Sequence, residues 1–315
     1  MASPENMTRY DRLLSACAGL PPASVAVVHP CDESSLEGAL AAERNGIIKP
    51  VLVGPRAKIL AAAQTAGLDL RDTPIHDAPH SDAAADAAVG LIREGQCEAL
   101  MKGSLHTDEL LRPVVARTGL RTNRRISHCF VLDVPGHKDP LIISDAAVNI
   151  APTLAEKVHI TQNAIDLGHA LRFESVRVAI LSAMETVNPD VPSTIEAAAL
   201  CKMADRGQIV GGILDGPLAL DNAINLDAAA TKHIVSPVAG RANVIIVPNL
   251  ESGNMLAKSL TFLGGATAAG VVLGARVPII LTSRADSLVA RIASCAVAAL
   301  VAAARRENPV AAVGA

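Results

Sequence analysis

Aromatic residues are nearly absent from this chain. Its 315 residues include one tyrosine, three phenylalanines and no tryptophan, and the formal net charge is −3 with both signs mixed along the sequence. Proteins that bind nucleic acids stack bases on aromatic rings or present a strongly basic surface. The chain has neither feature, so we expect no nucleic-acid partner.

Paired cysteines and the common nucleotide-binding loops are also missing. The six cysteines are scattered, with no C-x-x-C pair and no histidine at zinc-binding spacing, which favours reduced, buried thiols over a reactive thiol or a metal ligand. Neither G-x-G-x-x-G after a first strand nor G-x-x-x-x-G-K-[ST] occurs, and the first predicted strand ends in His29-Pro30-Cys31-Asp32 instead. We therefore expect no metal at the cysteines and no nucleotide site of either common kind.

Long hydrophobic runs are absent too, although half of the residues are apolar and the mean hydropathy is +0.34. The longest uncharged run of the last predicted helix, 292–304, is too short to cross a bilayer. The run 259–275 is interrupted by four glycines. The first residues show no basic segment followed by an apolar one, so we predict a cytoplasmic protein without a membrane span.

Predicted strands and helices alternate along the chain. Continuous apolar runs, typical of strands buried on both faces, cover 25–28, 51–53, 99–101, 176–181, 209–214, 244–247, 270–273 and 279–281. Helical patterns cover 33–45, 83–93, 154–170, 194–205, 255–263 and 287–304. This alternation predicts an α/β protein with mostly parallel sheets. A predicted hairpin over 126–144, with turn residues at Pro135-Gly136, interrupts the alternation of strands and helices and indicates a domain border.

The most informative segment lies near the C-terminus. A short apolar strand ends in Ser283, Arg284 and Asp286, and a long apolar helix follows at once. Helix N-termini favour anions, a guanidinium suits phosphate or carboxylate, and Asp286 could act as a base. The alternative is a simple helix cap, by Asp286 or Ser287, beside a surface arginine.

An earlier strand-to-helix junction has the same character. Lys102, His106 and Arg112 could face a polyanion, and Thr107 is expected to cap the helix. The alternative is an ordinary capped helix with surface charges. Pro113 removes a hydrogen bond within the second turn of such a helix, so we expect an irregular, functional loop.

Two loops of the middle region carry hydroxyls and carboxylates. Ser193 is expected to cap a helix, with Glu196 at capping-box spacing. Asp215 and Asp221 could bind a divalent metal or cap turns, and capping is favoured because no third carboxylate is near in sequence.

A further loop joins a predicted strand to a helix at Pro248. Gly253 permits the close backbone approach of a ligand, and Ser252 or Asn254 can cap the helix or donate a hydrogen bond. The alternative is a plain capped helix start.

In their order, these loops resemble the phosphate acetyl/butyryltransferase family. The segments Lys102-Gly103 and Ser283–Ser287 most resemble those of its butyryl-type branch and of the transferase half of fused enoyl-CoA hydratase–phosphate acetyltransferase proteins. The matching segments span most of the chain and are Met101-Lys-Gly103 with His106-Thr107 and Leu111-Arg112-Pro113, Ser144-Asp145-Ala-Ala-Val-Asn149, Val235-Ser-Pro-Val-Ala-Gly240, Val247-Pro-Asn-Leu-Glu-Ser-Gly253-Asn254 and Thr282-Ser-Arg-Ala-Asp-Ser287.

The resemblance implies two α/β domains of the isocitrate/isopropylmalate dehydrogenase-like kind, with the active site in the cleft between them. Residues 1–124 plus 269–315 would form domain one, and residues 125–268 domain two. Enzymes that look like this are usually homodimers. They exchange a short acyl group between coenzyme A and inorganic phosphate, without a metal and without an acyl-enzyme.

The resemblance also assigns roles to residues. Ser283 and Arg284 match positions that hold the reacting carbonyl and phosphate oxygens, and Arg112 matches a phosphate-binding arginine. The further substrate-binding candidates are Thr107, Lys102, His106, Ser252, Gly253 and Asn254. The acetyl-type branch places its catalytic aspartate where this chain has the apolar residues 288–290, which leaves Asp286 as the nearest candidate for the general base.

The main alternative is a metal- and NAD-dependent oxidative decarboxylase of the isocitrate/isopropylmalate dehydrogenase type. Asp221-Asn222-Ala223 is similar to the metal-binding strand end of those enzymes, but the chain has no second aspartate cluster and no dinucleotide-binding loop. A catalytically silent sensor of acyl-CoA or phosphate is a third hypothesis. The presence of Ser283, Arg284 and Arg112 argues against it.

Overall fold

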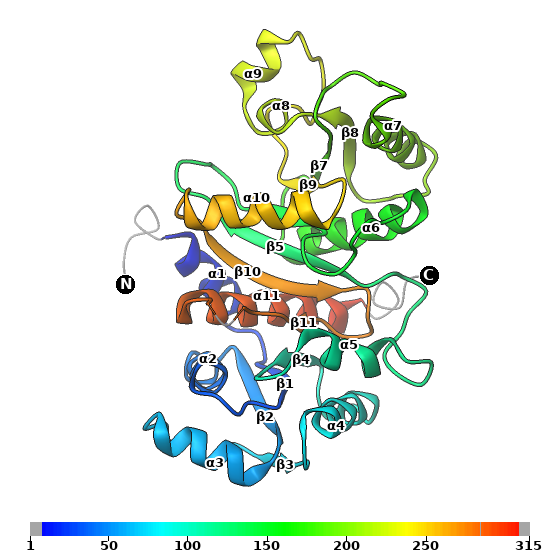
Figure 1. Ribbon diagram of the computed structural model, residues 1–315. Coiled ribbons are helices and arrows are strands. Elements are labelled where there is room, and N and C mark those ends of the chain that lie inside the picture. Colours follow the sequence, from blue (N-terminus) through cyan, green and yellow to red (C-terminus); the bar gives the residue numbers. More distant parts are fainter. Residues whose placement is uncertain (1–7, 284, 309–315) are drawn as a thin grey trace. The chain divides into compact units, whose positions relative to one another are not determined.

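The computed structural model describes residues 8–283 and 285–308. The chain divides into two compact units, one formed by Met1–Arg124 with Ala269–Ala315 and the other by Arg125–Ala268. We call them unit one and unit two. Unit one is discontinuous in sequence, since the C-terminal helix joins the N-terminal segment (red and blue in Figure 1).

The sheet of unit one has the strand order β3-β2-β1-β4-β11-β10. Its strands are β1 (Ala23–Val28), β2 (Ile48–Gly54), β3 (Ile75–Asp77), β4 (Ala99–Lys102), β10 (Thr267–Leu273) and β11 (Ile279–Ile280). Neighbouring strands from β3 to β11 run parallel, whereas β10 and β11 are antiparallel. In β1 all residues but Ser24 are buried, as expected for a strand covered on both faces.

The helices of unit one are α1 (Arg9–Cys17), α2 (Glu33–Arg44), α3 (Arg56–Thr65), α4 (Ser81–Arg93), α5 (Thr107–Val115) and α11 (Leu288–Glu307). Helices α1 and α2 pack against α11, while α4 packs with α5 and against β1 and β2 (Figure 1). By length and composition α11 could cross a membrane, but 78% of its most apolar window is buried in the structure. Its hydrophobicity is therefore accounted for by the core of unit one.

Unit two is organised around the strand order β5-β6-β9-β7-β8. Its elements are β5 (Ser127–Asp133), β6 (Leu141–Ser144), α6 (Leu154–Ala170), β7 (Arg177–Leu181), α7 (Pro192–Asp205), β8 (Ile213–Leu218), α8 (Leu220–Ile224), α9 (Leu226–Thr231), β9 (Val244–Ile246) and α10 (Leu250–Phe262). Helices α6 and α7 pack together against the strands. Leu256 and Leu260 of α10 pack against a buried hydrophobic cluster that includes Leu132, Ile143 and Ile245.

Both units are mixed α/β structures, and the isocitrate/isopropylmalate dehydrogenase-like architecture predicted from the sequence is not supported. Strands β5 and β6 are antiparallel, as are β10 and β11. These two pairs are antiparallel because the connections between their strands, residues 134–140 and 274–278, are short. These segments are too short for the crossover that a parallel pair requires.

Candidate functional site

The carboxyl ends of β1, β4 and β11 meet at one edge of the unit-one sheet. Val28 at the end of β1 lies opposite Lys102 of β4, and Ile280 at the end of β11 lies opposite Met101, with all three strands parallel. The unit-one residues predicted as site residues follow these strand ends. This is the edge at which α/β sheets bind ligands.

The loops after β1 and β4 are joined by their backbones. The N–H of Gly103 donates to the carbonyl oxygen of Val28, and the N–H of Ser104 donates to that of His29, both at 2.9 Å. The ring Nδ1 of His29 lies 2.9 Å from the Ser104 carbonyl oxygen. A Cβ on Gly103 would lie 2.4 Å from the Val28 oxygen, so a side chain cannot be accommodated there without moving the loops.

Asp32 strengthens the same junction, and the sequence analysis missed it. Its Oδ1 accepts the N–H of Ser35 at 2.8 Å and so caps α2. Burial alone would raise the pKa of Asp32, but hydrogen bonds from Ser35, Ser104 and Ser34 outweigh it and lower the pKa. The carboxylate is therefore held ionised next to the β4 loop.

The loop after β11 is closed by Asp286. Its Oδ2 accepts the backbone N–H of Ser283 at 2.6 Å, while the Ser283 side chain is exposed to solvent. Ser287, and not Asp286, caps α11, because its Oγ accepts the N–H of Ala290 at 3.2 Å. Burial raises the pKa of Asp286, against the hydrogen bond from Ser283 and the charge of Arg291, which lower it. Arg284 lies outside the described residues.

The segment that begins at Lys102 corrects two predictions. Residues Thr107–Val115 form α5, whose N-cap is His106 and not Thr107; the His106 N–H donates to Glu109 Oε2 at 2.6 Å. The expected irregular loop is also wrong, because Pro113 sits within this helix. It removes one hydrogen bond to the preceding turn and lies two residues before the helix ends at Val115. Lys102 is half-buried and its Nζ lies 3.4 Å from the Gly103 carbonyl oxygen.

Arg112 points to a carboxylate on the neighbouring helix. Its Nη2 lies 2.8 Å from Asp82 Oδ1 of α4, and the two side chains are 66% and 51% exposed. An exposed ion pair contributes about 1 kcal/mol or less. A phosphate group could therefore replace Asp82 as the partner of Arg112 at little energetic cost.

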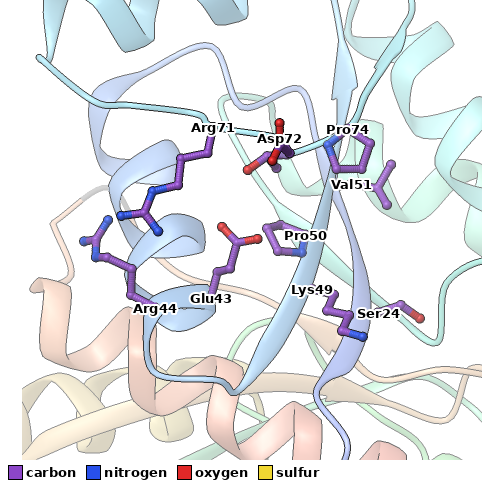
Figure 2. A pocket seen from close by; sticks show the side chains of 10 residues that line it. Ser24, Glu43, Arg44, Lys49, Pro50, Val51, Arg71, Asp72 and Pro74 are labelled. Carbon is purple, nitrogen blue, oxygen red and sulfur yellow. The ribbon is translucent and has the colours of Figure 1, made fainter.

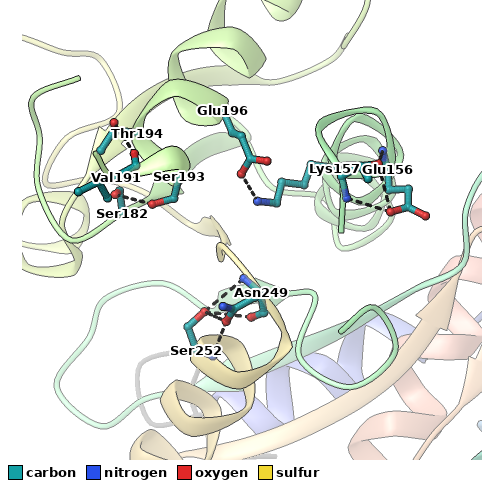
Figure 3. Close-up of polar contacts among 10 residues, drawn as sticks. Glu156, Lys157, Ser182, Val191, Ser193, Thr194, Glu196, Asn249 and Ser252 are labelled. Carbon is teal, nitrogen blue, oxygen red and sulfur yellow. Dashed lines mark hydrogen bonds and ion pairs between the residues drawn. The ribbon is translucent and has the colours of Figure 1, made fainter. Parts of the chain in front are cut away.

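The candidates of unit two lie at the start of α10. Asn249 is the N-cap of α10, and Ser252 forms two hydrogen bonds with it. The Ser252 N–H donates to Asn249 Oδ1 at 2.9 Å, and the Ser252 hydroxyl donates to the Asn249 carbonyl oxygen at 2.9 Å (Figure 3). The Asn254 side chain donates to the Ala146 carbonyl oxygen at 3.1 Å. Both polar side chains are thus engaged within the chain.

The close approach at Gly253 is made by the chain itself. A Cβ there would lie 2.6 Å from the carbonyl oxygen of Asp145 and 2.8 Å from Val247 Cγ2. Asp145, which is buried, organises this turn by accepting the N–H groups of Ala147 and Val148 at 2.9 and 3.0 Å. A side chain at position 253 would therefore clash with the loop after β6 and with Val247, so the tight turn at the start of α10 requires glycine.

The loop before α7 also differs from expectation. Ser193 is not a helix cap: the N-cap of α7 is Val191, and the Ser193 hydroxyl lies 2.9 Å from that of Ser182. Glu196 does not complete a capping box but pairs with the buried Lys157 of α6 (Figure 3). The capping-box spacing is therefore misleading here, because the Glu196 carboxylate forms an ion pair with Lys157 of another helix.

Metal-ligand geometry does not occur in the part of the chain that the structure describes. No group of three or more histidine, cysteine, aspartate or glutamate side chains gathers there. Asp215 accepts the N–H of Gly216 at 2.9 Å, as in a capped turn. All six cysteines are free, and burial raises the pKa of each thiol.

A groove of about 650 Å³ with several charged residues in its lining lies elsewhere in unit one. Its lining includes Ser24 at the start of β1, Lys49 near the start of β2, and Arg44, Arg71 and Asp72 (Figure 2). These positions are at the amino ends of the strands. The groove contains none of the predicted site residues and is separate from the edge described above.

Comparisons with known proteins agree with the family resemblance. A family model described as phosphate acetyl/butaryl transferase matches residues 78–299. A phosphate acetyltransferase of Rhizobium meliloti is 63% identical over 98% of both chains. A phosphate butyryltransferase of Clostridium beijerinckii is 41% identical over 93% of this chain and 98% of its own.

Among solved structures, a branched-chain phosphotransacylase from Enterococcus faecalis V583 matches with a TM-score of 0.76 and 27% identity, over 89% of this chain and 99% of its own. Three solved structures that match with TM-scores of 0.75 to 0.78 are a phosphotransacylase and two phosphotransacetylases, so the predicted isocitrate/isopropylmalate dehydrogenase-like fold is not supported. The oxidative decarboxylase alternative finds no support in these matches either.

Proposed function

The chain belongs to the phosphate acetyl/butyryltransferase family, and from this premise we propose how its residues act. It is an acyltransferase that exchanges a short acyl group between coenzyme A and inorganic phosphate. The match of the family model and of full-length relatives carries this assignment. Acetyl is the preferred group, because the 63% identical relative is a phosphate acetyltransferase and the butyryltransferase is more distant.

The chemistry centres on the loop after β11. In the direction of acyl-CoA synthesis, Asp286 accepts the proton of the CoA thiol, the thiolate attacks the acyl carbonyl carbon, and the bond to the phosphate oxygen breaks. The raised pKa of Asp286 supports this role, since a base works best when its pKa approaches the working pH. Ser283 and Arg284 stabilise the charge that grows on the carbonyl and phosphate oxygens.

The Ser283 side chain is suited to donate. Its Oγ accepts the N–H of Ala285 at 3.3 Å, which leaves the hydroxyl hydrogen for a substrate oxygen. The role of Arg284 rests on the family resemblance alone.

Phosphate is bound by the segment after β4. Arg112 exchanges Asp82 for a phosphate oxygen, and Lys102, His106 and Thr107 complete the polar surface around the start of α5. In unit two, Ser252, Gly253 and Asn254 bind substrate through the shape and backbone of their loop, because the two polar side chains already bond within the chain.

The reaction requires no metal and no tightly bound cofactor, with coenzyme A and phosphate as substrates. The enzyme acts in the cytoplasm as a homodimer joined through unit two. Large apolar side chains are exposed on that unit, among them Ile150, Met255, Phe262 and Leu263 at 75%, 62%, 76% and 88%. Such surface is commonly covered by a second subunit.

The test is an assay of CoA release from acetyl-, propionyl- and butyryl-CoA. Release should require phosphate or arsenate, should be fastest with acetyl-CoA, and should be unchanged by EDTA. CoA release at the same rate without phosphate would indicate a thioesterase. Magnesium-dependent reduction of NAD would indicate the decarboxylase.

A further inference from the structure

The loop that carries Ser283 and Asp286 rests on a buried arginine. Arg291, the fourth residue of α11, is 4% exposed. Its Nη1 donates to Thr282 Oγ1 at 3.1 Å, and its Nη2 donates to the Ser283 carbonyl oxygen at 2.8 Å. Burying a charged group is costly unless it is hydrogen-bonded. The guanidinium therefore needs its hydrogen bonds to Thr282 and Ser283, which it forms from the interior of the protein.

Helix α2 makes room for the arginine. A Cβ on Gly38 would lie 3.1 Å from Arg291 Cδ and 3.2 Å from Arg291 Cβ. The same position is 3.6 Å from Met101 Cε of β4. The stem of Arg291 is therefore confined between α2, α11 and β4, which fixes where its guanidinium can reach.

The charge of Arg291 also acts on Asp286. Burial raises the pKa of the Asp286 carboxyl, and the positive charge of Arg291 opposes that shift. Cys295, one turn further along α11, faces the same guanidinium, but burial raises its pKa to about 12, so it stays uncharged. Within the described residues, Arg291 is thus the ionised side chain that favours the carboxylate form of Asp286.

We infer that Arg291 is a positioning residue of the acyl-transfer site: its two donors hold the Thr282 hydroxyl and the Ser283 carbonyl oxygen from inside the protein. This inference rests on the proposed roles of Ser283 and Asp286. Arg291 itself touches no substrate, since it is buried. Its effect is on the orientation of Ser283 and on the pH at which Asp286 becomes protonated.

The test compares Arg291→Met, which keeps the length but removes charge and donors, with Arg291→Lys, which keeps the charge and loses the fork. Arg305→Met is the matched control. Arg305 lies on the same helix and donates to a backbone carbonyl, that of Arg276 at 2.8 Å, but far from the loop. For each variant, kcat, KM for both substrates and the pH profile of kcat are measured, with the melting temperature.

For Arg291→Met we expect kcat to fall by about tenfold or more with KM changed by less than about threefold, because misplacing reacting groups reduces turnover. Loss of a neighbouring positive charge raises the pKa of a carboxyl by about one unit or more. The acid limb of the kcat profile of Arg291→Met should therefore move to higher pH. Arg291→Lys should keep the acid limb in place and still lose kcat. Arg305→Met should resemble the unmodified enzyme.

A kcat and acid limb of Arg291→Met that equal those of Arg305→Met would overturn the inference. If Arg291→Met does not fold, a fully active Arg291→Lys would overturn the positioning role. The titration of Asp286, followed by ¹³C labelling of aspartate carboxyls and assigned with Asp286→Asn, separates this inference from the proposed function. Its midpoint should be higher in Arg291→Met even if the protein transfers no acyl group, and an unchanged midpoint would refute the charge effect.

Discussion

The Asp286 carboxylate and the Ser283 backbone hold each other in a closed turn. Asp286 Oδ2 accepts the Ser283 N–H at 2.6 Å, and the Asp286 N–H donates to the Ser283 carbonyl oxygen at 3.2 Å. One carboxylate therefore orients the residue proposed to hold the reacting oxygen and is itself the proposed base. Substitutions at Asp286 must be chosen to separate these two tasks.

Replacing Asp286 by asparagine separates them. The asparagine oxygen can still accept the Ser283 N–H but cannot take a proton from the CoA thiol. We expect acyl transfer from acyl phosphate to CoA to slow about a hundredfold, with partial recovery at higher pH, where solvent supplies the thiolate. A pH–rate profile measures this. Near-normal activity of the Asn variant, with a loss only in Asp286→Ala, would mean that the carboxylate serves the turn alone.

Arg112→Gln tests the phosphate-binding role. We expect kcat/KM for phosphate to fall about a hundredfold, as for the loss of one charge-assisted contact in the transition state. The melting temperature should hardly change, because the ion pair with Asp82 is exposed. Asp82→Asn, which breaks the same pair but leaves Arg112 in place, is the control and should retain activity. Equal losses in both variants would show that the pair itself is what matters.

Gly103→Ala tests the junction of the β1 and β4 loops. The added Cβ would meet the Val28 carbonyl oxygen at 2.4 Å, so we expect a loss of stability of several kcal/mol, of order 3 or more, from forced backbone movement. Gly90→Ala in α4 is the matched control, because no atom of residues 8–283 or 285–308 outside its own surroundings lies within 4 Å of the new Cβ. Alanine there should raise stability by about 0.5–1 kcal/mol. Urea unfolding of both variants measures the contrast, which a similar stability of the two would contradict.

His128 should make the protein sensitive to mild acid. The side chain is 1% exposed, its Nδ1 has no hydrogen-bond partner among the described residues, and burial lowers its pKa to about 4 despite the nearby Asp145. In the unfolded chain the pKa is about 6.5. Between these values the unfolded state binds the extra proton, so stability is full above pH 6.5 and falls as the pH drops towards 4, by about 3 kcal/mol in all.

The variant His128→Phe removes this titration and keeps a ring that can pack edge-on against Phe130, as His128 does. Its urea midpoint should change less between pH 7 and pH 5 than that of the unmodified protein. The same acid dependence in both proteins would show that other groups cause it.

Assembly through unit two predicts an effect of surface charge. Phe262→Glu with Leu263→Glu places two carboxylates on side chains that are 76% and 88% exposed. The folded monomer should tolerate the change, whereas a dimer interface there should not. Light scattering should report a dimer for the unmodified protein and a monomer for the variant, and a monomer in both cases would refute the proposed dimer.

Much of the fold could be predicted from local sequence, because burial on both faces leaves a continuous apolar run. The helix predicted over 154–170 is α6 with the same bounds, and the predicted strand over 25–28 is the main part of β1. Helix α3, however, was missed, since its alanine-rich sequence carries no clear apolar stripe. Predicted caps failed where a tertiary partner intervened, as Ser182 does for Ser193.

The site was only partly predictable for the same reason. Ser283 and Asp286 stand out because they interrupt an apolar pattern, but the side chains that hold them in place come from elsewhere. Arg291 reads as an ordinary helix charge until its burial is known, and Asp32 bonds Ser104 across more than seventy residues of sequence. Such contacts leave no periodic or local signal.

The discontinuity of unit one has a consequence for synthesis on the ribosome. Unit two, Arg125–Ala268, is one uninterrupted stretch and can fold as soon as it has emerged. The N-terminal segment cannot complete its core at that point, since β11 and the buried helix α11 are translated after unit two. The N-terminal segment thus reaches its final packing only after all of unit two has been translated, and a chain truncated before residue 288 would leave α1 and α2 without the helix they pack against.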